Sequence, residues 1–131
     1  MDSKFEFANE APVITTYTTQ GCLVFPVQTE LSKDTAMDIQ AELLQQVHST
    51  NYLGVVIDLS GIEIIDSVLW KILLNTSVMI NVLGYRTVVT GLSPGVVASI
   101  IDVNLELSNV KTAMTIQDAL NFLVSFKSFN K

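Results

Sequence analysis

The stretch GVVIDLSGIEIIDSVLWKILL, residues 54–74, decides the fold of this chain. Its first part, GVVIDLS (54–60), is a short apolar run interrupted by an acid near its end, which is typical of a strand buried on both faces of a parallel sheet. A helical segment follows, and RTVVTG (86–91) has the composition of a second buried strand. Strand, helix and parallel strand form one βαβ unit, whose crossover should be right-handed.

The segments before this unit predict a hairpin and an amphipathic helix. PVITTYTT (12–19) and CLVFPV (22–27) are rich in β-branched and aromatic residues and flank a Gln-Gly pair, which favours two antiparallel strands. Ser32 fits a helix cap, and apolar residues then recur at intervals of three and four. The inner face of this helix consists of Ala36, Ile39, Leu43 and Val47.

The segment after residue 91 predicts two more helices and one more strand. Ser93 fits a helix cap, and Pro94 fits the first helical position, where its missing N–H is no loss. A brief strand is expected near Val110, followed by a helix capped by Thr115. We therefore expect an α/β fold in which about four helices pack against a mixed sheet of about four to five strands.

Length and composition favour one domain with a large core. The chain has 131 residues, of which 49% are apolar and only 15% are charged, so some apolar side chains must stay at the surface. That excess suggests permanent partners. We expect an N-terminal arm over residues 1–11, one domain over 12–127 and a short tail over 128–131.

Charge and cysteine content argue against several classes of function. The net charge is −6 and no Lys/Arg cluster interrupts it, so nucleic acid is not an expected partner. The single cysteine, Cys22, forms no internal disulfide and suits a reducing compartment, which makes the cytoplasm the expected location. No apolar run is long enough to span a membrane, and the start of the chain lacks the apolar core of a signal peptide.

The beginning of the helix after residue 65 is the main candidate site. In open parallel sheets, functional loops lie beyond the carboxyl ends of the strands, and Gly61–Ser67 and Gly91–Pro94 are such loops. Asp66 fits the helix cap. Ser67 would be exposed in the first turn, beside free N–H groups and the positive end of the helix dipole. Ser67 is therefore either a capping serine or an acceptor for phosphate, and its spacing alone does not decide between the two.

The same helix is expected to expose a mixed face. On a helical wheel, Ser67 lies in line with the polar residues Lys71 and Asn75, and further along the helix the same line continues with apolar residues. The candidate partner-binding residues are Asp66, Ser67, Lys71, Leu74, Asn75 and Val78, and Val82 extends the line. Contact with another protein would explain such a stripe, and so would a neighbouring element of the same domain. The residues expected to face the sheet are Leu69, Leu73, Thr76, Ile80 and Leu83.

Other candidate residues are better explained by structure. Asp58 could join Glu63 and Asp66 around a hard cation, but anchoring of the loop is the simpler interpretation. His48 has no second imidazole with which to share a metal, and Cys22 has no activating neighbour. The sequence contains no glycine-rich phosphate loop and no nucleophile elbow. We therefore predict no catalytic residue, no metal and no cofactor.

The order of these motifs resembles the STAS domains, the sulfate transporter and anti-sigma-factor antagonist family, from about Val13 to Phe126. The motifs are Ile57-Asp58-Leu59, Ile65-Asp66-Ser67, Leu83-Gly84, the segment Val89 to Ala98, and Leu105-Glu106-Leu107. Within the family, the chain is most similar to the small stand-alone scaffold proteins of stressosomes. Trp70 departs from the family pattern by its bulk, and we expect it to adapt the exposed face to a particular partner.

The resemblance implies partner switching. Ser67 matches the serine that a dedicated kinase of the histidine-kinase-like ATPase fold phosphorylates in this family. Ser99 falls where related co-scaffold proteins carry a second phosphorylatable residue. The resemblance further implies homo- and hetero-oligomers with paralogous STAS co-scaffold proteins, sequestration of the kinase, its release on phosphorylation, and a phosphatase that resets the site.

Two other functions are compatible with the sequence. The apolar excess would suit a sensor that binds a small ligand between helix and sheet. An unswitched structural subunit, including an accessory to a membrane transporter, is the other alternative.

Overall fold

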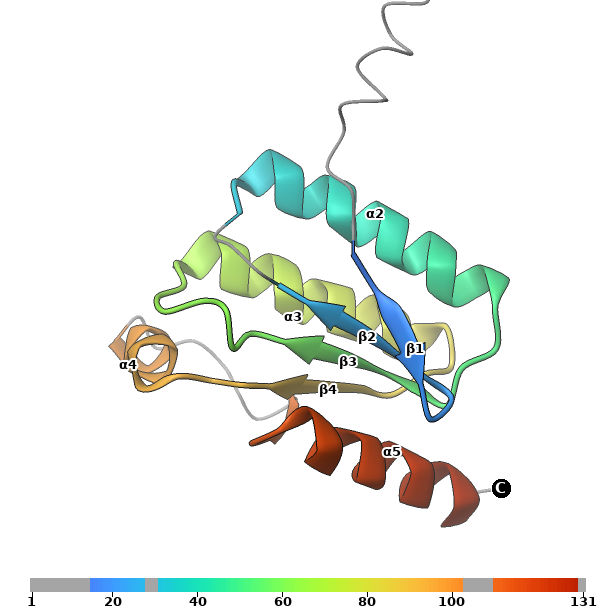
Figure 1. Ribbon diagram of the computed structural model, residues 1–131. Coiled ribbons are helices and arrows are strands. Elements are labelled where there is room, and N and C mark those ends of the chain that lie inside the picture. Colours follow the sequence, from blue (N-terminus) through green and yellow to red (C-terminus); the bar gives the residue numbers. More distant parts are fainter. Residues whose placement is uncertain (1–14, 28–30, 103–109, 130–131) are drawn as a thin grey trace, which may run out of the picture.

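The chain folds around one five-stranded sheet (Figure 1). The computed structural model describes residues 15–27, 31–102 and 110–129. The strands are β1 (Tyr17–Thr19), β2 (Cys22–Pro26), β3 (Gly54–Asp58), β4 (Thr87–Thr90) and β5 (Lys111–Ala113). They lie side by side in sequence order, with β1 antiparallel to β2 and the other neighbours parallel. This is the mixed sheet that the sequence predicts.

Helices cover both faces of the sheet. They are α2 (Lys33–Ser49), α3 (Ser67–Val82), α4 (Pro94–Asp102) and α5 (Ile116–Phe129). Figure 1 shows α2 and α3 together over one face, α5 over the opposite face, and α4 at the end of the sheet where β3 and β4 finish. The predicted βαβ unit thus consists of β3, α3 and β4, and α3 begins at the carboxyl ends of the parallel strands.

Successive side chains of the central strands β2, β3 and β4 point into two separate cores. From β2, Leu23 and Phe25 belong to the core under α2 and α3, whereas Cys22 and Val24 belong to the core over α5. The α5 core also contains Val56, Val88, Ala119, Leu120 and Leu123. Because both faces of the sheet are covered, the central strands have continuous apolar sequences rather than alternating ones.

The caps predicted from the sequence form at all four helices. The N–H of the third helical residue is bonded to the side chain of Ser32, Asp66, Ser93 and Thr115, at 3.2, 2.8, 3.2 and 3.0 Å. Each bond satisfies one N–H that has no partner inside its helix. The cap residues therefore fix where each helix begins.

Two details differ from the sequence prediction. The first strand begins at Tyr17, while residues 12–14 of the expected strand and the arm over residues 1–11 lie outside the described residues. Leu83 does not face the sheet: it is the C-cap of α3 and is 42% exposed. The wheel fails there because the helix ends and the chain turns at Gly84, whose φ is 102°.

Candidate functional site

The beginning of α3 is built from a cap and a hydrophobic clamp. Oδ1 of Asp66 accepts a hydrogen bond from the N–H of Leu69 at 2.8 Å. Ile65 and Trp70 flank the cap at the spacing of a hydrophobic staple, and both are buried. Trp70 is fully buried, so the expectation that it adapts the exposed face is wrong. The indole instead fills the core beneath the helix.

Ser67 is the first residue of α3 and is half-buried rather than exposed as the sequence predicts. Within the described part of the chain, its hydroxyl forms no hydrogen bond. The cap bond is made by Asp66 rather than by Ser67. The N–H groups of Ser67 and Val68 belong to the first turn, where backbone donors have no intrahelical partner. The Ser67 hydroxyl is thus available beside free donors at the positive end of the helix dipole.

The outer face of α3 is exposed and partly apolar. Lys71 and Asn75 are exposed, and Leu74 is half-buried. Val78 is 55% exposed and Val82 is 81% exposed, so no described element of the domain covers this end of the face. Two further exposed apolar side chains of this helix lie outside the stripe predicted from the helical wheel: Val68 and Met79. The face therefore offers apolar contact area on either side of a polar middle.

Buried polar contacts hold the loop that leads to Ser67. Asp58, at the end of β3, accepts hydrogen bonds from the hydroxyls of Ser60 at 2.7 Å and Thr90 at 2.9 Å. Gly91 has a φ of 73°, and a Cβ at this position would lie 2.6 Å from Asp58 Oδ1. Only glycine fits both conditions. The loop-anchoring role predicted for Asp58 is confirmed.

The N-terminus of α4 holds the other side of the same loop. The Ser93 hydroxyl donates to the carbonyl oxygen of Glu63 at 3.3 Å, and a Cβ at Gly95 would collide with that same oxygen. Ser99 is half-buried in α4, and its hydroxyl donates to the carbonyl oxygen of Gly95 at 2.9 Å. Ser99 is therefore engaged with its own helix, whereas Ser67 is not.

Metal ligands do not gather at this site. The described residues contain no group of three or more His, Cys, Asp or Glu side chains that could hold a metal ion. The Asp58 carboxylate already accepts hydrogen bonds from Ser60 and Thr90, while Glu63 and Asp66 are exposed. Burial raises the pKa of the Cys22 thiol, as expected for a core cysteine.

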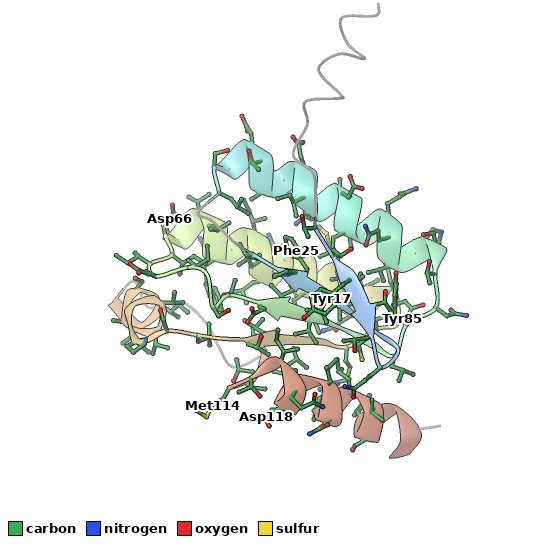
Figure 2. The ribbon with its side chains drawn as sticks, in the orientation of Figure 1. Tyr17, Phe25, Asp66, Tyr85, Met114 and Asp118 are labelled. Atoms are coloured by element: carbon green, nitrogen blue, oxygen red, sulfur yellow. The ribbon has the colours of Figure 1, made fainter. Side chains whose placement is uncertain are left out.

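A shallow apolar groove lies between the C-terminal halves of α2 and α3. Its volume is about 430 Å³. The lining residues are Leu44, Gln45, His48, Val78, Met79, Val82 and Leu83. Figure 2 labels Asp66 at the start of α3 and Tyr85 beyond its end, so the groove lies at the other end of the helix from Ser67. None of the described helices is long and apolar enough to cross a membrane.

Comparison with known proteins identifies relatives of this chain. The family model of the STAS domain matches residues 13–119. RsbT co-antagonist protein RsbRD of Bacillus subtilis (strain 168) is 24% identical over 120 residues, which cover 92% of this chain and 43% of RsbRD. The chain thus spans less than half the length of this curated relative.

Solved structures of similar fold include an RsbS variant and a chain from the stressosome. A variant of Moorella thermoacetica RsbS with a serine-to-glutamate substitution superposes with a TM-score of 0.74 at 24% identity, covering 86% of this chain and 96% of that chain. A chain from the stressosome superposes with a TM-score of 0.72 at 25% identity, covering 86% and 97%. The family model includes the loop after β3, Ser67 and α4, and it spans most of the sequence. The chain therefore belongs to the STAS domain family.

Proposed function

We propose that this chain is a non-enzymatic signalling scaffold of a stressosome-like complex, of the anti-sigma-factor antagonist type. In its unmodified form it binds a serine kinase of the histidine-kinase-like ATPase fold, together with paralogous STAS co-scaffold proteins in the cytoplasm. Phosphorylation of Ser67 releases the kinase. A phosphatase then resets the site.

The free hydroxyl of Ser67 carries this proposal. It lies in the first turn of α3, while Asp66 makes the cap bond to Leu69 at 2.8 Å. Modification of Ser67 would thus break no described hydrogen bond of the fold. The same helix exposes Val78 and Val82, which a bound protein would cover. A modifiable group and a docking face on one rigid helix are the parts that a partner switch needs.

A phosphate on Ser67 would change the charge of this face. It adds about −1.5 to −2 charges at pH 7. The free first-turn N–H groups and the helix dipole favour that charge, and Lys71, one turn further along α3, is placed to pair with it. Asp66 and Glu63 oppose it. The modified helix would stay folded but would present an anion to a partner that had docked on a partly apolar surface.

The names of the relatives support the type of function proposed. RsbRD, RsbRA and RsbRB of Bacillus subtilis are RsbT co-antagonist proteins. One structural neighbour comes from the stressosome, described as a signal integration and transduction hub. A role in the same type of assembly is the simplest one for a chain with their fold and with Ser67 free at the start of α3.

The experiment combines the purified protein with a serine kinase of this class and ATP. Peptide mass spectrometry locates the phosphate, and light scattering follows the size of the complex. We expect phosphate on Ser67 together with loss of the kinase from the complex. Absence of phosphate at Ser67 while the complex stays intact would overturn the proposal.

Three serine variants separate the switch from a general charge effect. We expect Ser67→Asp to weaken kinase binding by about tenfold or more, by the electrostatic argument above, and Ser67→Ala to bind the kinase without releasing it. Ser99→Asp makes the same change on α4 and should leave binding within about twofold of the unmodified protein, as for a charge outside the interface. Release by Ser99→Asp instead of Ser67→Asp would move the switch to α4.

The groove between α2 and α3, rather than a pocket between helix and sheet as the sequence suggests, supports a second candidate, a small-ligand sensor. Its volume of about 430 Å³ and its apolar lining would accept an apolar ligand. A ligand bound there would raise the melting temperature with concentration. Val82→Asp, at the rim of the groove, should abolish that rise, and a rise unaffected by the substitution would exclude this site.

A further inference from the structure

Two cations and two aromatic rings meet beside α5. The rings of Phe122 and Phe126 are stacked, with their centroids 5.8 Å apart. The guanidinium of Arg86 lies 4.5 Å from the Phe126 centroid, and Nζ of Lys111 lies 4.4 Å from the Phe122 centroid. Cations are attracted to the negative face of an aromatic ring. The rings thus hold the two charged groups in place at the surface.

No carboxylate in the described part of the chain neutralises these two cations. Both side chains are exposed, and their side-chain interactions there are the ring contacts. A ring positions a cation without cancelling its charge. Arg86 and Lys111 therefore form a local positive site in a chain whose net charge is −6.

An acidic stripe lies on the outer face of α2. Asp34, Asp38 and Glu42 are spaced by four residues and are exposed, so their side chains lie one above another along the helix. No Lys or Arg occurs from residue 34 to residue 47. The Cβ atoms of neighbouring members of the stripe are therefore about 6 Å apart, and no Lys or Arg lies between them in the sequence.

The positive site and the acidic stripe lie toward opposite ends of the sheet. Arg86 directly precedes β4, and Lys111 opens β5, so both lie at the amino ends of parallel strands. Figure 2 shows Tyr85, the neighbour of Arg86, at the other end of the molecule from Asp66. Figure 1 shows α2 beginning at that Asp66 end. Because the two surfaces differ in position and sign, one molecule can offer each of them to a different neighbour.

We propose that Arg86 and Lys111 dock onto the Asp34–Glu42 stripe of α2 in a second copy of this chain. The contact is head to tail, so each added copy leaves one free surface of either kind and the assembly grows into a ring or an open chain. Complementary charge selects the partner surface and the orientation. This inference is independent of Ser67 and of any kinase, so its test succeeds or fails separately from that of the proposed function.

The test uses two charge-reversed variants of the full chain. Variant T carries Arg86→Glu and Lys111→Glu, and variant H carries Asp34→Lys and Asp38→Lys. Sedimentation velocity over a concentration series measures self-association. We expect each variant alone to self-associate at least about tenfold more weakly than the unmodified chain, because opposed charges become like charges.

Mixing the two variants gives the decisive result. In an equimolar mixture, the lysines of H face the glutamates of T, and the unaltered carboxylates of T face the unaltered cations of H. We therefore expect association to return in the mixture. Failure of the mixture to associate would overturn the proposal, as would variants that self-associate like the unmodified chain or an unmodified chain that stays monomeric.

Salt and matched variants guard against indirect effects. Self-association should weaken between about 0.1 M and 1 M salt, since the screening length falls from about 10 Å to about 3 Å. Arg86→Gln with Lys111→Gln lacks the repulsion and should give an intermediate loss, and its melting temperature shows whether the fold is intact. Gln117→Glu with Asn121→Glu changes the net charge by the same amount as the paired glutamine variant. These two residues are exposed on α5, so this control should not weaken association. If this control loses as much association as the paired glutamine variant, net charge alone explains the effect, and the proposed docking site is wrong.

Discussion

The two faces of the sheet differ in how much core they hold. Among the described residues, the core on the α2 and α3 side contains 19 buried apolar residues and the core on the α5 side contains 7, so most of the described apolar burial supports the layer that carries Ser67. Because burial of apolar surface is the main favourable term in folding, we expect α3 to be held more firmly than α5. Its outer face can then be varied without loss of the fold.

The difference also separates two kinds of surface. The α3 surface presents exposed apolar side chains near the half-buried Ser67 and rests on the larger core. The α5 surface carries aromatic rings that hold cations above the smaller core. We expect core substitutions to differ in cost between the two layers, and surface substitutions on α3 to affect binding rather than folding.

The largest predicted effect is that of Trp70→Ala. The indole is fully buried in the larger core, so its removal should lower the free energy of unfolding by about 3–5 kcal/mol. Urea denaturation followed by circular dichroism measures the change. Trp70→Phe serves as the control and should cost less, because most of the volume is kept. A cost for Trp70→Ala below that of a core alanine substitution beside α5 would reverse the ranking of the two layers.

The second prediction concerns the contact between Gly54 and Leu123 in the smaller core. A Cβ at Gly54 would lie 2.5 Å from Cδ2 of Leu123, so Gly54→Ala should destabilise by about 1–3 kcal/mol through overpacking. Leu123→Ala should cost about 2–5 kcal/mol through the cavity that it leaves. The double variant should be less destabilised than the sum, because the new methyl group enters the space that Leu123 vacates. Additive costs in urea denaturation would show that the two residues do not share this space.

Much of the fold follows from short-range signals in the sequence. Ser32, Asp66, Ser93 and Thr115 are helix caps in the sequence and in the structure, because a cap needs only one side chain and the N–H three residues on. The continuous apolar runs likewise predict strands covered on both faces. The predictions for Trp70 and Leu83 are wrong: Trp70 is buried and Leu83 is 42% exposed. Whether a large apolar residue lies inside, and where a helix stops, depends on neighbouring elements that periodicity does not describe.

The candidate site was predicted in part. The position of Ser67 follows from the spacing of the cap, and the exposure of Lys71, Asn75 and Val78 follows from the wheel. The clamp of Ser93 and Gly95 on Glu63 could not be predicted, because it joins two loops about thirty residues apart in sequence. The ring-held cations were missed for the same reason. Arg86, Lys111 and Phe122 come from three elements, and no local pattern brings them together.

The third prediction tests the cap of α3 itself. Asp66→Ala removes the acceptor for the Leu69 N–H and should lower the free energy of unfolding by about 1 kcal/mol. Asp66→Asn keeps an acceptor and should recover most of the loss. The measurement is thermal unfolding of the three proteins side by side. An equal loss in both variants would mean that the negative charge, rather than the hydrogen bond, supports the start of the helix.

The smallest predicted effect lies on the outer face of the same helix. Val82 is 81% exposed, so Val82→Thr should change the free energy of unfolding by less than about 0.5 kcal/mol, as is usual for surface positions away from caps and cores. Ile80, two residues earlier, is fully buried, and Ile80→Thr places a hydroxyl in the core and should cost several times more. Urea denaturation of both variants compares the two faces of α3 directly. A cost for Val82→Thr approaching that of Ile80→Thr would mean that another part of the chain covers this face, leaving no room for a partner protein there.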